Sequence, residues 1–175
     1  MSSGLVYLRP MKVTHVRAPG LGADAAKSAW NDLVAHLRHS HTINRVDRSY
    51  GMSFGSGLLD SREADEPFYD AAIEWLPEME ISPDSPLRLR TLPGGTYLRQ
   101  RLQGAAEEIS SVFRRLCATA EHETGLPLDP KRPLIEIYLG RQPGELHGAR
   151  IDLCVPVDPA KAGGKPDVFA PPAAA

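Results

Sequence analysis

The sequence predicts an α+β fold in which duplicated β-α-β-β units form one mostly antiparallel sheet, with two helices on one face and a central ligand cleft. The chain has 175 residues, a length that suits one ordinary domain. A succession of strand-like, helical and again strand-like segments occurs twice, at a nearly constant spacing along the chain. One helix cannot cover the sheet of a single unit, so two units are expected side by side.

Each unit opens with a strand that follows a proline turn. Val13–Ala18 and Thr96–Leu102 are the two strand-like segments, and Pro10 and Pro93 precede them. A shift of 83 positions places one proline on the other. The first strands of the two units are therefore predicted to be equivalent.

An amphipathic helix follows in each unit. Ala25–Arg38 and Ala105–Glu121 carry apolar residues at i, i+3, i+4 and i+7, which predicts one buried stripe on each helix. The same shift aligns Trp30 with Phe113 inside these stripes. Gly125 is expected to end the second helix.

Two alternating strands complete each unit. The first unit offers Ser49–Gly57 and Tyr69–Trp75, and the second offers Leu134–Leu139 and Ile151–Val157. Few residues are identical between the halves. The prediction of a repeat therefore depends on the shared order of the segment types.

The predicted domain covers residues 5–157. Its repeat halves span about 5–77 and 86–157. The remainder, 158–175, is dominated by alanine, glycine and proline without apolar periodicity, and we expect a flexible tail there.

Composition excludes several classes of protein. Twenty Lys and Arg residues against 22 Asp and Glu residues give a net charge of −2, which does not favour a protein that coats DNA or anionic membranes. The apolar runs are much shorter than a membrane span, and the first residues do not resemble a secretory signal. Cys117 and Cys154 lie in apolar segments and are interpreted as reduced thiols of a cytoplasmic protein.

Strand alternation separates the residues of Leu134–Leu139 into two faces. Glu136 and Tyr138 share one face, and the apolar residues between them share the other. We expect the apolar face to meet the helices and Glu136 to point into a groove on the opposite side. The residues expected toward the helices are Ile135, Ile137, Leu139 and, in the matching strand, Met52 and Phe54.

The matching strand places Gly51 and Ser53 on the groove side, where the other half has Glu136 and Tyr138. Small side chains opposite large ones leave room beside a carboxylate, as a ligand site requires. The predicted ligand-binding residues add two rings near the sheet. The full set is Glu136, Tyr138, Gly51, Ser53, Phe68 and Tyr97.

Glu136 is the most informative residue of this set. An ionised carboxylate in an apolar strand costs several kcal/mol unless it is paired. A delocalised cation stacked on aromatic rings offsets that cost by Coulomb attraction and cation–π contact. The alternative is a structural ion pair with Arg99 or Arg101 on a neighbouring strand.

Several runs of sequence together resemble a known family. The runs RTLPGGTYLRQRLQGAAEEISSVF, PLIEIYLG and ARIDLCVPV, with YGMSF and FYDAAIEW, resemble the GyrI-like small-molecule-binding domain. That domain occurs as the effector half of some AraC-type and MerR-type regulators and as a stand-alone protein. The resemblance covers roughly Tyr7 to Val157 and implies a duplicated β-α-β-β fold with a central cleft. It also implies a buried ligand-binding glutamate, which matches Glu136, with Tyr138 as the aromatic residue beside it.

The resemblance implies three alternative functions. The first is a stand-alone cytoplasmic, multidrug-type protein that captures hydrophobic, planar, often cationic compounds, without direct DNA binding and without a membrane. The second is a hydrolase of cyclopropane-bearing DNA-alkylating natural products, in which Glu136 and Tyr138 are catalytic. The third is a protein-binding inhibitor of the gyrase type, for which a protein partner is needed. No metal and no cofactor is expected for any of them.

Overall fold

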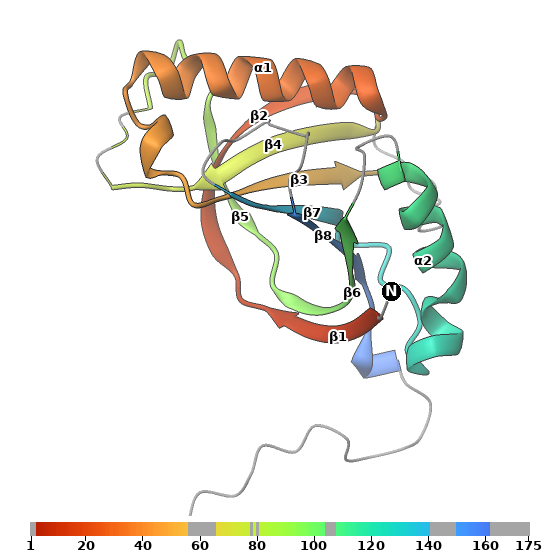
Figure 1. Ribbon diagram of the computed structural model, residues 1–175. Helices are drawn as coiled ribbons and strands as arrows, with labels where there is room; N and C mark the ends of the chain where they lie inside the picture. Colours follow the sequence, from red (N-terminus) through yellow and green to blue (C-terminus); the bar gives the residue numbers. More distant parts are fainter. Residues whose placement is uncertain are drawn as a thin grey trace, which may run out of the picture.

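The computed structural model describes residues 3–55, 66–77, 79, 81–103, 108–140 and 150–161. It confirms the α+β prediction: one antiparallel eight-stranded sheet carries two α-helices (Figure 1). The elements in chain order are β1 (Ser3–Leu8), β2 (Met11–Pro19), α1 (Ala23–His39), η1 (Ile43–Arg45), β3 (Arg48–Phe54), β4 (Phe68–Glu74), β5 (Arg88–Leu92), β6 (Gly95–Gln103), α2 (Ile109–Thr124), β7 (Leu134–Leu139), β8 (Arg150–Pro156) and η3 (Pro159–Lys161).

The strand order shows the duplication directly. The order is β1-β6-β8-β7-β3-β4-β2-β5, which is symmetric about the central β7–β3 pair. Strands β1 and β5, which the sequence analysis did not predict, are equivalent under this symmetry. Each pairs with a strand of the other unit, β1 with β6 and β5 with β2, so the two halves hold each other at the sheet edges.

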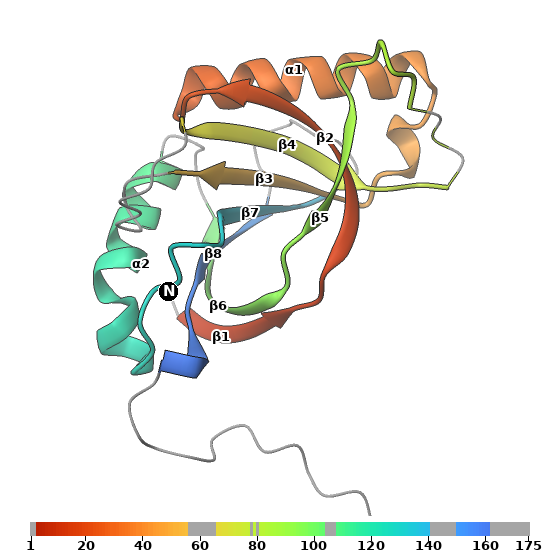
Figure 2. The same ribbon diagram turned by 180° about the vertical axis from the view of Figure 1, so that it is seen from behind.

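The two edges of the sheet are joined by continuous chain. Strand β1 continues into β2, and β5 continues into β6, so two long bent strands run antiparallel to each other. Leu8 pairs with Gly95 and Met11 with Leu92, and the register passes through both bends without a shift. The sheet therefore closes on itself and encloses an inner face (Figure 2).

Proline and glycine form the two bends, as the aligned prolines predict. Pro10 and Pro93 lack the backbone N–H that a strand needs, which favours a bend in each long strand. A Cβ on Gly94 would lie 2.5 Å from the Cδ of Pro10, so the bends touch where a side chain would not fit. Arg132 fastens this region by donating to backbone oxygens, among them that of Thr96 at 3.2 Å.

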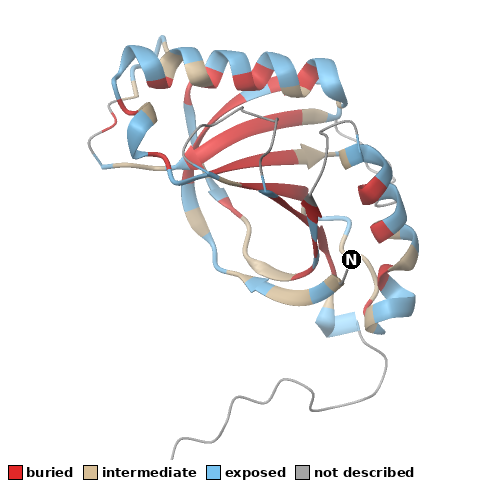
Figure 3. Cartoon of the chain, in the orientation of Figure 1, coloured by how far each residue is buried: buried red, intermediate tan, exposed pale blue. Residues whose placement is uncertain are grey.

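Both helices pack on the outer face of the sheet. Helix α1 lies over β2 and β4, and α2 lies over β6 and β8, with their apolar stripes buried (Figures 1 and 3). Trp30 and Phe113 belong to the same core cluster between helices and sheet, which confirms the prediction that they share a face. Gly125 caps α2 in the left-handed region at φ 71°, as glycine allows. Neither described helix has the length and apolar character needed to cross a membrane.

The assignment of the two sheet faces is opposite to the expectation. The helices cover the face that carries Glu136 and Tyr138, because Tyr138 packs in the core cluster beneath them. The other face becomes the enclosed interior when the sheet closes, and it takes the aliphatic side chains. The residues expected toward the helices that lie on this inner face instead are Met52, Phe54, Ile135, Ile137 and Leu139.

The chain remains structured from Asp158 to Lys161. The backbone N–H of Asp158 donates to the carbonyl of Pro127 at 2.8 Å, and Pro159–Lys161 forms a 3-10 turn. Most of the predicted tail, residues 162–175, lies outside the described residues.

Candidate functional site

The site begins with a carboxylate in the middle of the sheet. Glu136 lies on central strand β7, and only 6% of the residue is exposed. Its cross-strand neighbours are Gly51 on β3 and Leu153 on β8. The side chains of these two neighbours carry no charge and no hydrogen-bond donor. The hydrogen bonds to the Glu136 carboxylate therefore come from more distant side chains.

Two tyrosine hydroxyls supply those hydrogen bonds. Tyr69 from β4 donates to Oε2 of Glu136 at 2.9 Å, and Tyr138 from β7 donates to the same oxygen at 2.5 Å. Both donors meet one carboxylate oxygen. Neither hydroxyl donates to Oε1.

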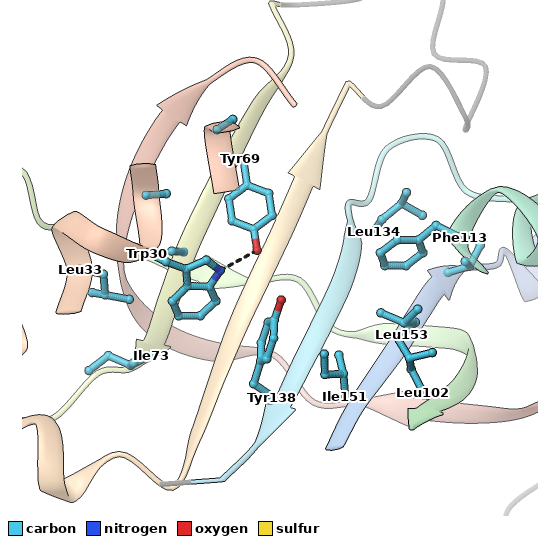
Figure 4. Close-up of a cluster of buried hydrophobic side chains, with 14 of the residues drawn as sticks. Trp30, Leu33, Tyr69, Ile73, Leu102, Phe113, Leu134, Tyr138, Ile151 and Leu153 are labelled. Carbon is cyan, nitrogen blue, oxygen red and sulfur yellow. Dashed lines mark hydrogen bonds between the residues drawn. The ribbon is translucent and has the colours of Figure 1, made fainter. Parts of the chain in front are cut away.

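Helix α1 contributes to this arrangement through Trp30. The indole Nε1 donates to the Tyr69 hydroxyl at 3.0 Å, as the dashed line in Figure 4 marks. The Trp30 ring also meets Tyr138 edge-on, with ring centroids 5.2 Å apart and an interplanar angle of 77°. Trp30 therefore contacts both tyrosines that hold Glu136.

Gly51 makes room for the hydrogen bond between Tyr69 and Glu136. A Cβ at this position would lie 2.7 Å from Oε2 of Glu136 and would overlap the Tyr69 hydroxyl. Strand β3 lies between β4 and β7, so the Tyr69 side chain must pass over it to reach Glu136. Only a residue without a side chain permits that path.

Burial sets the proton affinities of the three groups. It raises the pKa of Glu136 above the ordinary value of 4.5, while the hydrogen bonds from Tyr138 and Tyr69 act in the opposite direction. Burial also raises the pKa of Tyr69 and of Tyr138, and the nearby Glu136 charge adds to both shifts. Both phenols therefore stay protonated at neutral pH and act as hydrogen-bond donors.

The alternative of a structural ion pair is wrong for the two arginines considered. Arg99 and Arg101 lie on the inner face and pair with Asp152, at 3.6 Å and 2.7 Å. No cationic side chain of the described residues forms an ion pair with Glu136. In the described part of the chain, the side-chain donors to its carboxyl group are the two hydroxyls.

The structure brings together four of the six predicted ligand-binding residues. Glu136, Tyr138 and Gly51 meet as described, and Ser53 lies on the same face, opposite Leu134. The other two predicted residues lie on the opposite face of the sheet.

Phe68 stacks on Phe54 with centroids 4.6 Å apart, beneath the guanidinium of Arg17. Tyr97 is fully buried in the inner cluster, beside Arg132. The closed sheet thus separates both rings from Glu136.

Tyr69 and Trp30 are partners of the carboxylate that were not predicted from the sequence. Tyr69 shares its strand alternation with Ala71 and Ile73, and all three lie in the core cluster beneath the helices. That alternation was the available signal. It became informative only once the helix-covered face was known to be the face of Glu136.

Comparison with known proteins places the chain in a family. The GyrI-like small molecule binding domain matches residues 1–158. No curated protein matches the chain.

Solved structures share the fold at low sequence identity. A conserved protein from Listeria innocua superposes with a TM-score of 0.60 at 16% identity, covering 89% of this chain and 92% of that one. SAV2435 bound to tetraphenylphosphonium gives 0.56 at 14%, covering 93% and 98% of the two chains. A hydrolase from Listeria innocua gives 0.57 at 14%, covering 89% and 91%.

Proposed function

The chain belongs to the GyrI-like small-molecule-binding domain family, and from this premise we propose that it captures hydrophobic, planar, often cationic compounds beside Glu136. One observation carries the proposal: a buried carboxylate is held by two phenol hydroxyls, with no cation next to it among the described residues. We place this function in the cytoplasm, because both cysteines are free thiols, as a reducing compartment favours.

A cationic ligand would complete the electrostatics of this site. Charge removed from water is costly unless an opposite charge lies close by, and aromatic rings attract a delocalised cation. Trp30 and Tyr138 lie next to the carboxylate and offer such rings. The structural neighbour SAV2435, solved with the organic cation tetraphenylphosphonium, supports this ligand class.

A calorimetric titration tests the proposal. Wild type and Glu136→Gln are titrated with tetraphenylphosphonium and with triphenylphosphine oxide, a related molecule without net charge. Gln keeps the shape of Glu but removes its charge. We expect the cation to bind the variant roughly tenfold to a hundredfold more weakly, since a charge-assisted contact contributes about 1.5–3 kcal/mol.

The neutral compound should lose much less affinity, because it does not use the charge. Glu74→Gln is the matched control, since Glu74 is an exposed carboxylate at the end of β4. Equal affinity of the cation for wild type and Glu136→Gln would contradict the proposal.

A hydrolase that opens strained rings is the second candidate. A general acid must keep its proton near neutral pH, and burial raises the pKa of Glu136 in that direction. Tyr138 donates to the same carboxyl group at 2.5 Å, so an acid and a phenol lie side by side. A structural neighbour from Listeria innocua is named as a hydrolase.

Mass spectrometry distinguishes the two candidates. A cyclopropane-bearing alkylating compound is incubated with wild type and with Glu136→Gln. A product whose mass is greater by one water molecule, and which only the wild type forms, would show turnover. Recovery of the unchanged compound from a saturated complex would show binding alone.

A further inference from the structure

The hydrogen bonds at Glu136 distinguish its two oxygens. Trp30 Nε1–H can only donate, so the Tyr69 oxygen is its acceptor and the Tyr69 proton is directed to Oε2. The Tyr138 proton is directed to Oε2 as well. An oxygen that already accepts two short hydrogen bonds is a poor site for a further proton. Oε1 is therefore the oxygen that takes up a proton when the carboxyl group is neutral.

Within the described part of the chain, no other group beside Glu136 could supply or hold this proton. Cross-strand neighbours Gly51 and Leu153 are apolar, and the buried stripes of α1 and α2 carry no ionised side chain. Cys117 on α2 is half-buried, and burial raises the pKa of its thiol to about 11, so it is neutral. Among the described residues, the titratable groups that face Glu136 are Tyr69 and Tyr138, and both are hydrogen-bond donors that keep their own protons.

We propose that each organic cation that binds beside Glu136 displaces one proton, carried on Oε1 in the empty site. The proton passes to solvent and the cation replaces it, so the net charge of the site is the same before and after binding. This inference rests on the proposed function. It names the preferred ligands as permanent cations, such as quaternary phosphonium or ammonium compounds, because these bring no proton of their own.

This exchange of a proton for a cation makes the affinity for a permanent cation depend on pH, with a defined sign. Below the pKa of Glu136 in the empty protein, each pH unit of acidification weakens binding about tenfold, because the cation must displace a bound proton. Above that pKa the carboxyl group is already ionised and the affinity is constant. A neutral ligand shows no such dependence.

The number of protons released can be measured directly. Tetraphenylphosphonium is titrated into the full chain by calorimetry at each pH from 5 to 8, in two buffers that differ in ionisation enthalpy. We expect a release that approaches one proton at low pH and falls toward zero at high pH. Glu136→Gln should release none, because its side chain carries no titratable proton.

Each outcome has a separate meaning. Tight binding that weakens in Glu136→Gln, without proton release at any pH, overturns the exchange and leaves the proposed function intact. Equal release by wild type and Glu136→Gln also overturns the exchange, because another group then supplies the proton. Equal cation affinity of the two proteins overturns the proposed function itself.

Tyrosine variants test the origin of the proton without removing the carboxylate. Tyr69→Phe removes one donor from Oε2, which raises the pKa of Glu136 further and should move proton release to higher pH. Tyr97→Phe is the matched control, because the Tyr97 hydroxyl donates to the carbonyl of Pro93 on the inner face. An unchanged pH profile in Tyr69→Phe would contradict the role of the two phenols.

Discussion

The two halves of the sheet carry the same arginine–aspartate pair at equivalent positions. Arg17 donates to both oxygens of Asp70 at 2.8 and 3.0 Å, and Arg101 donates to both oxygens of Asp152 at 2.7 and 3.0 Å. Both pairs lie on the inner face, where each joins two neighbouring strands of one unit. These ion pairs are therefore part of the fold that both units have in common.

At the centre of the sheet the two halves differ. Strand β7 brings Glu136 and Tyr138, where the equivalent strand β3 has Gly51 and Ser53. These two strands pair across the symmetry axis, so the acid lies directly opposite the glycine. The side chains common to both halves therefore support the duplicated fold, whereas the candidate site lies where the halves meet and differ.

The largest predicted effect concerns the two equivalent aromatic residues on the helices. Trp30 is 5% exposed and Phe113 is 4% exposed, so replacing either with Ala should cost about 3–5 kcal/mol of unfolding free energy. Trp30→Ala should cost more, since it also removes the donor to Tyr69. Urea unfolding measures both values. A smaller cost for Trp30→Ala than for Phe113→Ala would contradict a structural role for the indole N–H.

The second prediction concerns the shared ion pairs. Asp70 is fully buried and also accepts a hydrogen bond from Arg90 at 2.6 Å, whereas the second arginine at Asp152 lies 3.6 Å away. Asp70→Asn should therefore cost about 3 kcal/mol, at the low end for a broken buried pair because the arginines are partly exposed. Asp152→Asn should cost less. Equal losses in thermal or urea unfolding would show that the second arginine does not matter.

The third prediction tests the difference at the centre. Gly51→Ala places a methyl group where the Tyr69 hydroxyl lies, and such overpacking costs about 1–3 kcal/mol. The change should also separate Tyr69 from Glu136 and weaken tetraphenylphosphonium binding. Ser53→Ala, on the same strand and face, is the control and should stay within about 0.5 kcal/mol of wild type. Unchanged cation binding in Gly51→Ala would show that the Tyr69 contact is dispensable.

The sequence predicted the repeat, both helices and the strands that carry the central residues. Leu134–Leu139 coincides with β7, and the alternation along it separated Glu136 from its neighbours correctly. Local periodicity is sufficient for this because each element buries one face. Strands β1 and β5 were missed because they are edge segments whose pairing joins residues far apart in the chain, such as Ser3 and Gln100.

The face of the sheet on which Glu136 lies could not be predicted. Alternation separates two faces, but in β7 both faces are buried, so the pattern does not say which one meets the helices. Closure of the sheet decides this, because it turns the aliphatic face inward. The same closure places Phe68 and Tyr97 away from Glu136 and brings Tyr69 over Gly51, contacts that depend on strand order rather than on spacing in the sequence.

The smallest predicted effect removes the central difference between the halves. In Glu136→Gln the side-chain oxygen can still accept hydrogen bonds from the two tyrosine hydroxyls, but the negative charge is lost. Both halves are then uncharged at the centre of the sheet. In the folded protein, burial raises the pKa of Glu136 above its ordinary value of 4.5. Between that value and the folded pKa, the folded state holds a proton that the unfolded chain has released. Stability of the wild type therefore falls as pH rises through this window, and the loss is constant above it.

The variant lacks this pH-dependent contribution to the free energy of unfolding. The difference in stability between the two proteins therefore separates the contribution of Glu136 from that of every other titrating group. Glu136→Gln should be the more stable protein at pH 7, and the difference should change by at most about 1.4 kcal/mol per pH unit inside the window. The advantage should shrink as the pH approaches 4.5. Urea unfolding of both proteins without ligand, with Glu74→Gln as the exposed control, measures it. A difference that stays constant from pH 4 to 8 would mean that Glu136 titrates alike in the folded and unfolded states. The negative charge of Glu136 would then add no pH-dependent cost to folding.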